Sequence, residues 1–207
     1  MRIGIYGGTF NPIHRGHLTA AAAAAKQLCL DKLLLVPDAI PPHKPLPAGS
    51  ADAADRLEMV QLCTGELPVP AEVMDLELRR QGASYSCDTL AALREQYPAD
   101  ELFFLMGSDM FLSFETWRRP EEICRLATLA VFSRRTADEA AAFARQKEKL
   151  EKAFSARVTV VMNPEVIEGS STQLREELAR GRGRAYLTEP VYGYILRKGL
   201  YGTATDL

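Results

Sequence analysis

Two histidines near the N-terminus have a spacing that could serve phosphate chemistry. The stretch GGTFNPIHRGHL, residues 7–18, places His14 and His17 three positions apart. Side chains with this spacing share one face of a helix, so both imidazoles could donate hydrogen bonds to one phosphate whose oxygens gain charge in a transition state. A helix start alone would explain a single histidine, but two of them between glycines favour a functional site.

The residues before these histidines fit an anion site. An apolar run at 2–6 is followed by Gly7, Gly8, Thr9 and Phe10. Glycines let the backbone come close to a ligand, and a helix that follows presents unpaired N–H groups and a positive dipole end. A zinc site is disfavoured because no third histidine or cysteine stands nearby. The absence of G-x-G-x-x-G argues against a dinucleotide-binding dehydrogenase.

The elements that must position these residues alternate along the chain. Short apolar segments bounded by turn or polar residues predict strands, at 2–6, 32–37, 71–78, 101–107, 127–133 and 157–162. Segments of helical character lie between most of them, at 15–29, 51–65, 86–97, 135–154 and 171–180. Because parallel neighbours need crossovers, this alternation predicts an α/β fold with a doubly wound, mostly parallel sheet. Ligands bind beyond the carboxyl ends of such strands, where residues 7–18 stand.

Composition narrows the class of protein. With 207 residues, 47% of them hydrophobic, the chain can bury a proper core; we expect one domain over 1–207, closed by a small C-terminal helical part at 188–202. A net charge of −2 argues against a nucleic-acid or membrane-surface binder. The 4 scattered cysteines fit a reducing compartment, and no signal or membrane-spanning segment is evident. We therefore expect a cytoplasmic protein, and leave a homo-oligomer open.

A second motif could also cradle phosphate. In GSSTQLR, residues 169–175, Ser170 and Gln173 have the spacing of a capping box, which would open a helix with Arg175 about one turn in. An isolated helix cap is common and would say nothing alone. The Pro-rich stretch at 37–55, by contrast, predicts a long mobile loop over a site.

These motifs together resemble a known family. GGTFNPIHRGHL is similar to the T/HxGH motif of the nucleotidyltransferase superfamily, and GSSTQLR is similar to its late SSTxxR motif. The segments VPDAIPPHK, SYSCDTL, FFLMGSDMFLSFETW and PVYGYILRKGLY extend the resemblance over nearly the whole chain to the bacterial nicotinate-nucleotide adenylyltransferases. Two departures are Ser86, where that family commonly has threonine, and Gly169, where isoleucine is expected.

The resemblance implies a Rossmann-like nucleotidyltransferase fold and an enzyme of NAD biosynthesis. It would transfer the adenylyl group of ATP to nicotinate mononucleotide and release pyrophosphate. By this resemblance, the catalytic residues are His14, His17 and Arg175. ATP and its phosphates would be bound by Gly7, Gly8, Thr9, Phe10, Gly107, Asp109, Arg134, Ser170, Ser171 and Thr172. The acceptor would contact Lys44, Ser86 and Trp117. Mg²⁺ would arrive with ATP, with no metal held by the protein itself.

The implied chemistry is an in-line displacement by a phosphate oxygen. A phosphate monoester is already ionised near neutral pH, so no general base is required, and catalysis rests on positioning and charge stabilisation. The only tryptophan, Trp117, could stack on a pyridinium ring through cation–π attraction. Two other readings stay open: a nicotinamide-dependent oxidoreductase and a non-catalytic nucleotide sensor. The amide, nicotinamide mononucleotide, also remains an alternative acceptor.

Overall fold

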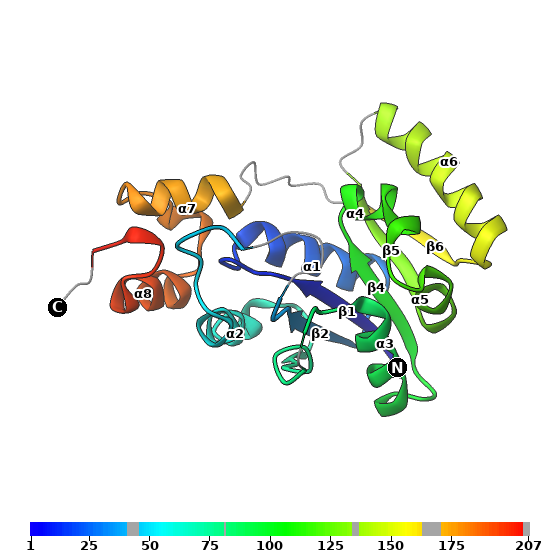
Figure 1. The fold of residues 1–207 in the computed structure, drawn as a ribbon, viewed down its shortest axis with the longest axis horizontal. Coiled ribbons are helices and arrows are strands. Elements are labelled where there is room, and N and C mark those ends of the chain that lie inside the picture. The colour runs from blue at the N-terminus through cyan, green and yellow to red at the C-terminus, as the bar shows by residue number, and fades with distance from the viewer. Residues whose placement is uncertain (41–45, 81, 134–136, 163–170, 205–207) are drawn as a thin grey trace.

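The protein is described by a computed structural model that covers residues 1–40, 46–80, 82–133, 137–162 and 171–204 (Figure 1). Its strands are β1 (Arg2–Gly8), β2 (Lys32–Pro37), β3 (Ala71–Val73), β4 (Glu101–Met106), β5 (Thr128–Ser133) and β6 (Val158–Met162). Within the described residues they form one sheet, ordered β3-β2-β1-β4-β5-β6, in which every paired strand is parallel. The order runs outward from β1 and β4 in opposite directions. The predicted doubly wound sheet is confirmed.

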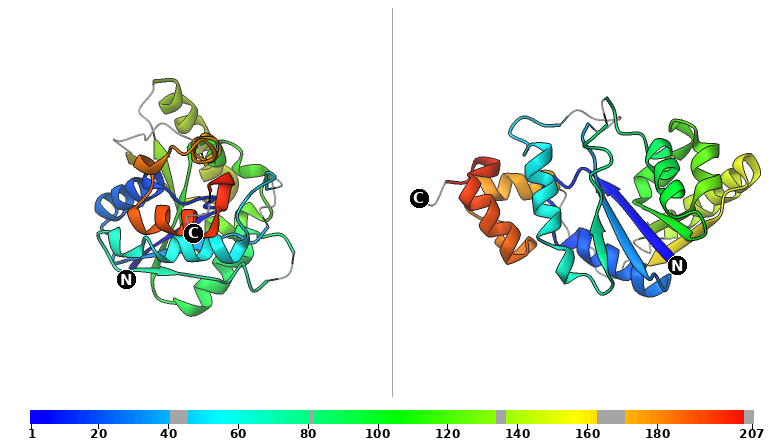
Figure 2. Two further views of the ribbon diagram at one scale, coloured as in Figure 1. Left: turned by 90° about the vertical axis from the view of Figure 1, so that its left-hand side faces the viewer. Right: turned by 90° about the horizontal axis from the view of Figure 1, so that it is seen from below.

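Helices cover both faces of this sheet (Figure 2). They are α1 (Arg15–Gln27), α2 (Ala53–Gln61), α3 (Ser86–Gln96), α4 (Ser108–Leu112), α5 (Pro120–Leu126), α6 (Ala137–Phe154), α7 (Ser171–Ala179) and α8 (Glu189–Lys198). The predicted C-terminal helical part is present: α8 ends at Lys198 and is capped by Gly199, whose φ of 59° suits the left-handed turn after a helix. Figures 1 and 2 show α7 and α8 beside α2, at the end of the molecule away from α6.

Alternating side chains along each strand build two hydrophobic cores. Successive residues of a strand point to opposite faces, so Leu33 and Leu35 of β2 join one core while Leu34 and Val36 join the other. The first core contains residues of α1, α2, α7 and α8. The second contains residues of α3, α4, α5 and α6. Strands buried on both faces are nearly continuous apolar runs, which is why the sequence signals them well.

One predicted strand is wrong over more than half of its length. We expected 71–78, but β3 ends at Val73. Beyond it the backbone turns, with the N–H of Arg79 donating to the carbonyl of Asp75 at 3.1 Å. The Glu77 side chain is buried against α3, where it accepts a hydrogen bond from Thr89 at 2.6 Å. The apolar alternation continued past the point at which the chain leaves the sheet to make this contact.

Candidate active site

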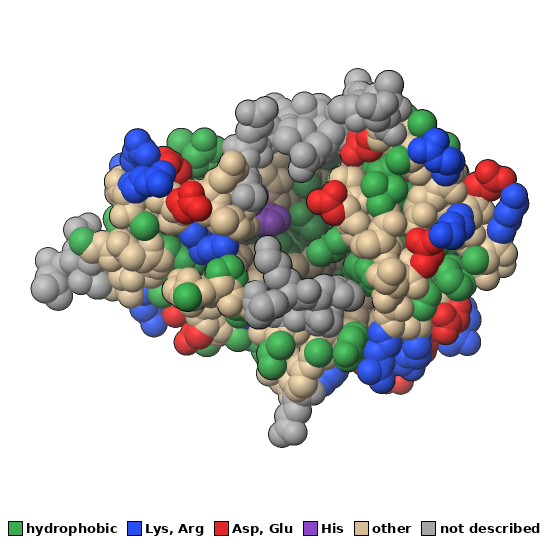
Figure 3. Space-filling view, turned by 45° about the horizontal axis from the view of Figure 1, so that its top comes forward, with side chains coloured by type: hydrophobic (Ala, Val, Ile, Leu, Met, Phe, Trp, Pro, Cys, Tyr) green, Lys and Arg blue, Asp and Glu red, His purple; other side chains and the backbone are tan. Residues whose placement is uncertain are grey.

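A cavity of about 450 Å³ lies at the carboxyl ends of β1 and β4, where the strand order reverses. This is the place where open parallel sheets bind ligands. Predicted site residues in its lining are Gly7, Gly8, Thr9, Phe10, His17, Gly107, Asp109, Ser171, Thr172 and Arg175. The space-filling view shows the hollow, with a histidine side chain exposed inside it (Figure 3). The two motifs, distant in sequence, therefore meet in one cavity.

The two histidines form the start of α1. His14 caps the helix: its Nδ1 accepts from the N–H of Gly16 at 3.1 Å, and the N–H of His14 donates to Nδ1 of His17 at 3.2 Å. A neutral imidazole whose Nδ1 accepts carries its proton on Nε2. Both rings therefore offer an Nε2–H donor. The ring centroids lie 3.8 Å apart, with the two ring planes tilted by 37°.

Burial keeps both imidazoles neutral at physiological pH. Loss of solvent lowers the pKa of His14 to about 4. Burial, and secondly the neighbouring His14, lowers the pKa of His17 well below its ordinary value. Desolvation penalises the charged form of an imidazole, which is the direction seen here. The pair is thus arranged to donate hydrogen bonds rather than to carry fixed charge.

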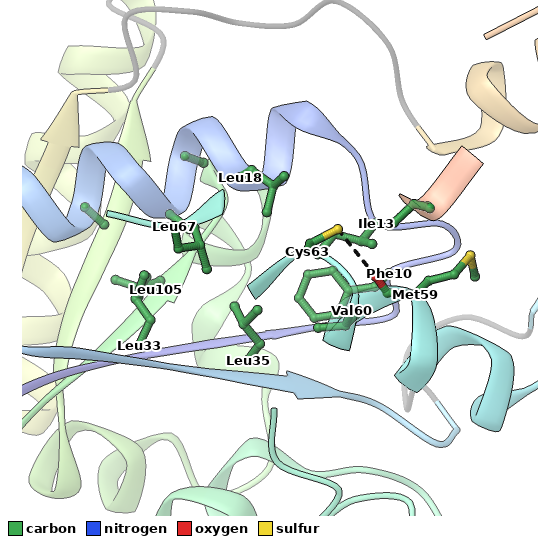
Figure 4. Packing of buried hydrophobic residues seen from close by; sticks show 14 of the residues in the cluster. Phe10, Ile13, Leu18, Leu33, Leu35, Met59, Val60, Cys63, Leu67 and Leu105 are labelled. Atoms are coloured by element: carbon green, nitrogen blue, oxygen red, sulfur yellow. Dashed lines mark hydrogen bonds between the residues drawn. The ribbon is translucent and has the colours of Figure 1, made fainter. Parts of the chain in front are cut away.

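The turn between β1 and α1 is shaped by Phe10. Its φ of 46° lies in the left-handed region, which is uncommon for a residue with a side chain. Its ring is buried among Leu35, Met59 and Val60 (Figure 4), and it meets the His17 ring edge-on at 5.2 Å between centroids. The side chain therefore braces His17 from the core, so that any contact of Phe10 with ATP falls to its backbone.

The end of β4 supplies the opposite wall of the cavity. Gly107 caps α4 and Asp109 lies in the first turn of that helix. A Cβ added at Gly107 would meet no atom within 4 Å, so the glycine leaves open space beside the strand end. The exposed Asp109 carboxylate lines this space. Its position suits hydrogen bonds from the hydroxyls of a sugar, as in other nucleotide-binding sheets.

The late motif reaches the site through α7. Arg175 lies one turn into this helix, as predicted, and its guanidinium donates to the carbonyl of Asn11 at 2.7 Å and to Oγ1 of Thr172 at 3.1 Å. Arg175 thereby ties α7 to the β1–α1 turn, 164 positions away. The predicted site residues Lys44, Arg134 and Ser170 lie outside the described residues.

The remaining acceptor candidates lie on the other face of the sheet. Ser86 begins α3. Trp117 is partly buried against the second core, with ring centroids 5.5 Å from Phe114 and 6.2 Å from Phe104. Phe104 in turn lies 3.9 Å from the position of a Cβ on Gly7. Trp117 thus stands beside the end of β1 but across the sheet from α1, and neither residue is among those lining the cavity.

Sequence reasoning missed Arg56 of α2, which is fully buried. Its guanidinium donates to the carbonyls of Thr9 at 2.7 Å, Asp38 at 2.8 Å and Ala39 at 3.2 Å, and pairs with the Asp38 carboxylate at 3.3 Å. A buried charge needs such partners. Nothing in the local pattern marks it, because an arginine on a helix usually faces solvent.

The chain is similar to known proteins over most of its length. The cytidylyltransferase-like family model matches residues 5–177. The probable nicotinate-nucleotide adenylyltransferase of Gloeobacter violaceus is 42% identical over 205 residues, covering 97% of this chain and 96% of the relative. That of Thermus thermophilus is 43% identical over 202 residues, covering 97% of this chain and all of the relative (100%). The chain belongs to the nicotinate-nucleotide adenylyltransferase family.

The fold of this adenylyltransferase family member also has solved counterparts. The nicotinic acid mononucleotide adenylyltransferase of Plasmodium falciparum, complexed with NaAD, superposes with a TM-score of 0.76 over 99% of each chain. At 18% sequence identity this similarity shows a shared fold. The family resemblance and the Rossmann-like architecture predicted from the motifs are confirmed. In the described part of the chain, no helix has the length and apolar character needed to cross a membrane.

Proposed function

We infer that the chain transfers the adenylyl group of ATP to nicotinate mononucleotide, forming deamido-NAD (NaAD) and pyrophosphate in NAD biosynthesis. The observation that carries this function is the meeting of both phosphate motifs in the cavity at the reversal point of the sheet. Membership of the adenylyltransferase family supplies the reaction class and the acceptor.

We propose that the cavity positions an in-line displacement. An oxygen of the acceptor's 5′-phosphate forms a bond to the α-phosphorus of ATP while the bond from that phosphorus to the bridging oxygen breaks, and pyrophosphate leaves with the bond's electrons. His17, whose ring lies against that of His14, would donate from Nε2–H to oxygens that gain charge, and Arg175 would hold a neighbouring phosphate. No residue has to remove a proton from the attacking phosphate, because that phosphate is already ionised.

In this proposal, the adenosine of ATP and the nicotinate ring of the acceptor bind on opposite sides of β1. Asp109 would accept hydrogen bonds from the adenosine ribose beside Gly107. Trp117 would stack on the nicotinate ring, and the N–H groups at the start of α3, near Ser86, would favour its carboxylate over a neutral amide. By family resemblance, Lys44 would assist the acceptor, and Arg134 and Ser170 the phosphates of ATP.

Mg²⁺ enters this proposal as part of the substrate, bound to ATP. Among the residues that the structure describes, no three His, Cys, Asp or Glu side chains converge into a metal site. Phosphate oxygens and water would then supply most of the ligands, which is the usual arrangement for this ion.

We further propose that the reaction takes place in the cytoplasm, without nucleic-acid or membrane partners. The four cysteines all lie in described residues and are free thiols, three of them buried. Unpaired buried thiols are typical of a reducing compartment. The small negative net charge of −2 is consistent with substrates met at a local positive site.

The test is mass-resolved product formation from Mg-ATP, with nicotinate mononucleotide, nicotinamide mononucleotide and phosphopantetheine offered separately and pyrophosphate release followed in parallel. We expect NaAD as the dominant product. NAD as the dominant product would overturn the choice of acceptor. Nucleotide binding with no adenylylated product from any of the three would overturn the assignment as an enzyme and favour a sensor. A change in absorbance at 340 nm, caused by hydride transfer to or from a nicotinamide cofactor, would indicate an oxidoreductase.

A further inference from the structure

A chain of buried polar contacts runs between the β1–α1 turn and the beginning of α3. It is made by side chains or backbone groups of Thr9, Asp38, Ala39, Arg56, Glu77, Ser84 and Thr89, called here the buried polar network. The proposed mechanism assigns it no role. In the proposed function, the network connects the turn beside the phosphates of ATP with the helix start beside the acceptor. The role inferred for it therefore rests on the proposed function.

The first half of the buried polar network is centred on Arg56. The guanidinium reaches carbonyls on two segments, Thr9 after β1 and Asp38–Ala39 after β2. Oγ1 of Thr9 donates to the Asp38 carboxylate at 2.7 Å, which closes the ring of contacts. The two loops that follow neighbouring strands are thus joined through one buried cation.

The second half is centred on Glu77. The N–H of Ala39 donates to Oγ of Ser84 at 3.2 Å, and the N–H of Ser84 donates to the carbonyl of Ile40 at 3.0 Å. The carboxylate of Glu77 accepts from the hydroxyl of Thr89 at 2.6 Å. Burial raises the pKa of Glu77, and the hydroxyls of Thr89 and Ser84 oppose that rise. Thr89 lies on α3, one turn beyond its first residue. The loop after β2 is therefore joined to the start of α3.

The chemistry of these groups fixes the direction of each contact. A guanidinium only donates, a carboxylate only accepts, and the Ser84 hydroxyl does both. Arg56, Glu77, Ser84 and Thr89 are all buried. A shift of either end would leave a buried donor or acceptor unpaired, which is unfavourable for each group that loses its partner. The buried polar network therefore resists relative movement of the two ends.

We propose that Arg56 and Glu77 are positioning residues that hold the ATP-side turn and the acceptor-side helix start in one fixed arrangement, without contact to either substrate. The orientation of an attacking oxygen against the α-phosphorus depends on both ends at once. In-line reactions lose rate steeply when this geometry loosens. Arg56 and Glu77 then act on the reaction through a shared structure rather than as two separate supports.

The fold offers a matched control in Arg94. Its guanidinium donates to the carbonyls of Tyr97 at 3.1 Å, Pro98 at 3.4 Å, Asp100 at 2.8 Å and Leu126 at 2.8 Å. It thus serves four backbone acceptors, but at the end of α3 next to the beginning of β4, at the opposite edge of the sheet from the cavity. Arg94→Lys removes a similar set of hydrogen bonds without touching the buried polar network.

The experiment compares Arg56→Lys, Glu77→Gln, their double variant and Arg94→Lys in NaAD formation, together with thermal unfolding. We expect each network variant to lower kcat/KM for the acceptor by about tenfold or more, the effect of one lost hydrogen bond to a charged group. The double variant should lose far less than the product of the single losses, because groups in one network are not additive. Arg94→Lys should lower Tm but leave kcat/KM within about twofold, as a change remote from the site.

Thr89 provides a milder pair should the charged variants fail to fold. Thr89→Ser keeps the hydroxyl that donates to Glu77 and should retain wild-type kinetics, whereas Thr89→Val loses it and should resemble Glu77→Gln. Multiplicative losses in the double variant, or equal kinetics for Thr89→Val and Thr89→Ser, would overturn the proposal.

Hydrogen exchange of the substrate-free protein separates this proposal from the proposed function. Glu77→Gln or Thr89→Val should speed amide exchange not only at 84–89 but also at 8–10, the far end of the buried polar network. Faster exchange confined to 84–89 would overturn the coupling. A wild-type protein that forms no NaAD would overturn the function, while the exchange result would still decide whether the network joins the two ends.

Discussion

In both His14 and His17 one ring nitrogen is bound to the backbone and the other is left as a donor, and of the two side chains His17 lines the cavity. Both Nδ1 atoms accept backbone N–H groups, so the helix cap itself sets the tautomer. Donation from Nε2 follows from this local geometry and from burial, which keeps the rings neutral. At the scale of residues, the proposed mechanism therefore gives this capping pair a second role, in catalysis.

The two nitrogens of His17 can be separated by substitution. His17→Asn keeps an acceptor near the position of Nδ1 but has no group in place of Nε2–H, whereas His17→Gln places an amide near Nε2 and loses the cap. We expect His17→Asn to lower kcat by about a hundredfold, the usual effect of losing one donor to a transition-state oxygen, with a nearly unchanged Tm. His17→Gln should retain more activity at a lower Tm. Steady-state kinetics and thermal melts check both; full kcat in His17→Asn would refute the donor role.

The low histidine pKa values also predict a pH dependence of stability. Between pH 6.5, where an unfolded histidine titrates, and about pH 4, where His14 titrates in the fold, the unfolded chain binds more protons. The free energy of unfolding should therefore fall as pH decreases through this window, by about 1–3 kcal/mol. Urea unfolding at several pH values measures it. The double variant His14→Asn/His17→Asn is the control and should have a flatter profile; an identical profile would contradict the assigned burial effect.

At the scale of elements, the ends of the strands are shaped by glycines, which have no Cβ atom. A Cβ on Gly8 would lie 3.3 Å from the Phe10 ring, so that the turn and its buried ring depend on each other. Gly107, by contrast, faces open space beside α4. The first glycine serves packing within the turn, and the second serves access to the cavity.

Gly107→Ala tests whether the nucleotide occupies that open space. The added methyl meets no protein atom, so the fold should tolerate it, while a nucleotide lying against the strand end would be displaced. We expect KM for ATP to rise about tenfold, equivalent to roughly 1.4 kcal/mol. Gly65→Ala is the matched control, since a Cβ there also meets nothing within 4 Å and Gly65 does not line the cavity. Equal KM values in the two variants would place the nucleotide elsewhere.

At the scale of the whole molecule, the C-terminal helices contact the elements that carry the site. Tyr194 of α8 donates to the Asp55 carboxylate at 2.7 Å, and Lys198 pairs with the same carboxylate at 3.4 Å. Asp55 precedes the buried Arg56 on α2, and α7 carries Arg175 to the turn after β1. The last part of the chain thus supports the first, as the paths of α7 and α8 in Figure 1 show.

Tyr194→Phe tests this support separately from the chemistry. Loss of one hydrogen bond to a carboxylate should lower the free energy of unfolding by about 0.5–1.5 kcal/mol, because the docking of α8 on α2 is weakened. The kinetic constants should stay unchanged, since no group in the cavity is removed. Denaturant unfolding and steady-state kinetics supply the two readouts, with Tyr192→Phe as a hydroxyl deletion on the same helix. A changed KM with unchanged stability would contradict a purely supporting role.

Local patterns in the sequence were sufficient to predict most elements, the doubly wound sheet and the two motif-bearing helix starts. Strand periodicity, glycines and cap residues act over a few positions, so they can be read without knowledge of the fold. The same local signal failed at 74–78, where a buried contact between Glu77 and Thr89 draws the chain out of the sheet. Only the tertiary structure decided that Arg175 meets Asn11, that Trp117 stands across the sheet from His17, and that Arg56 is buried beneath Thr9. Those contacts join residues far apart in sequence, and they depend on the packing of several elements at once.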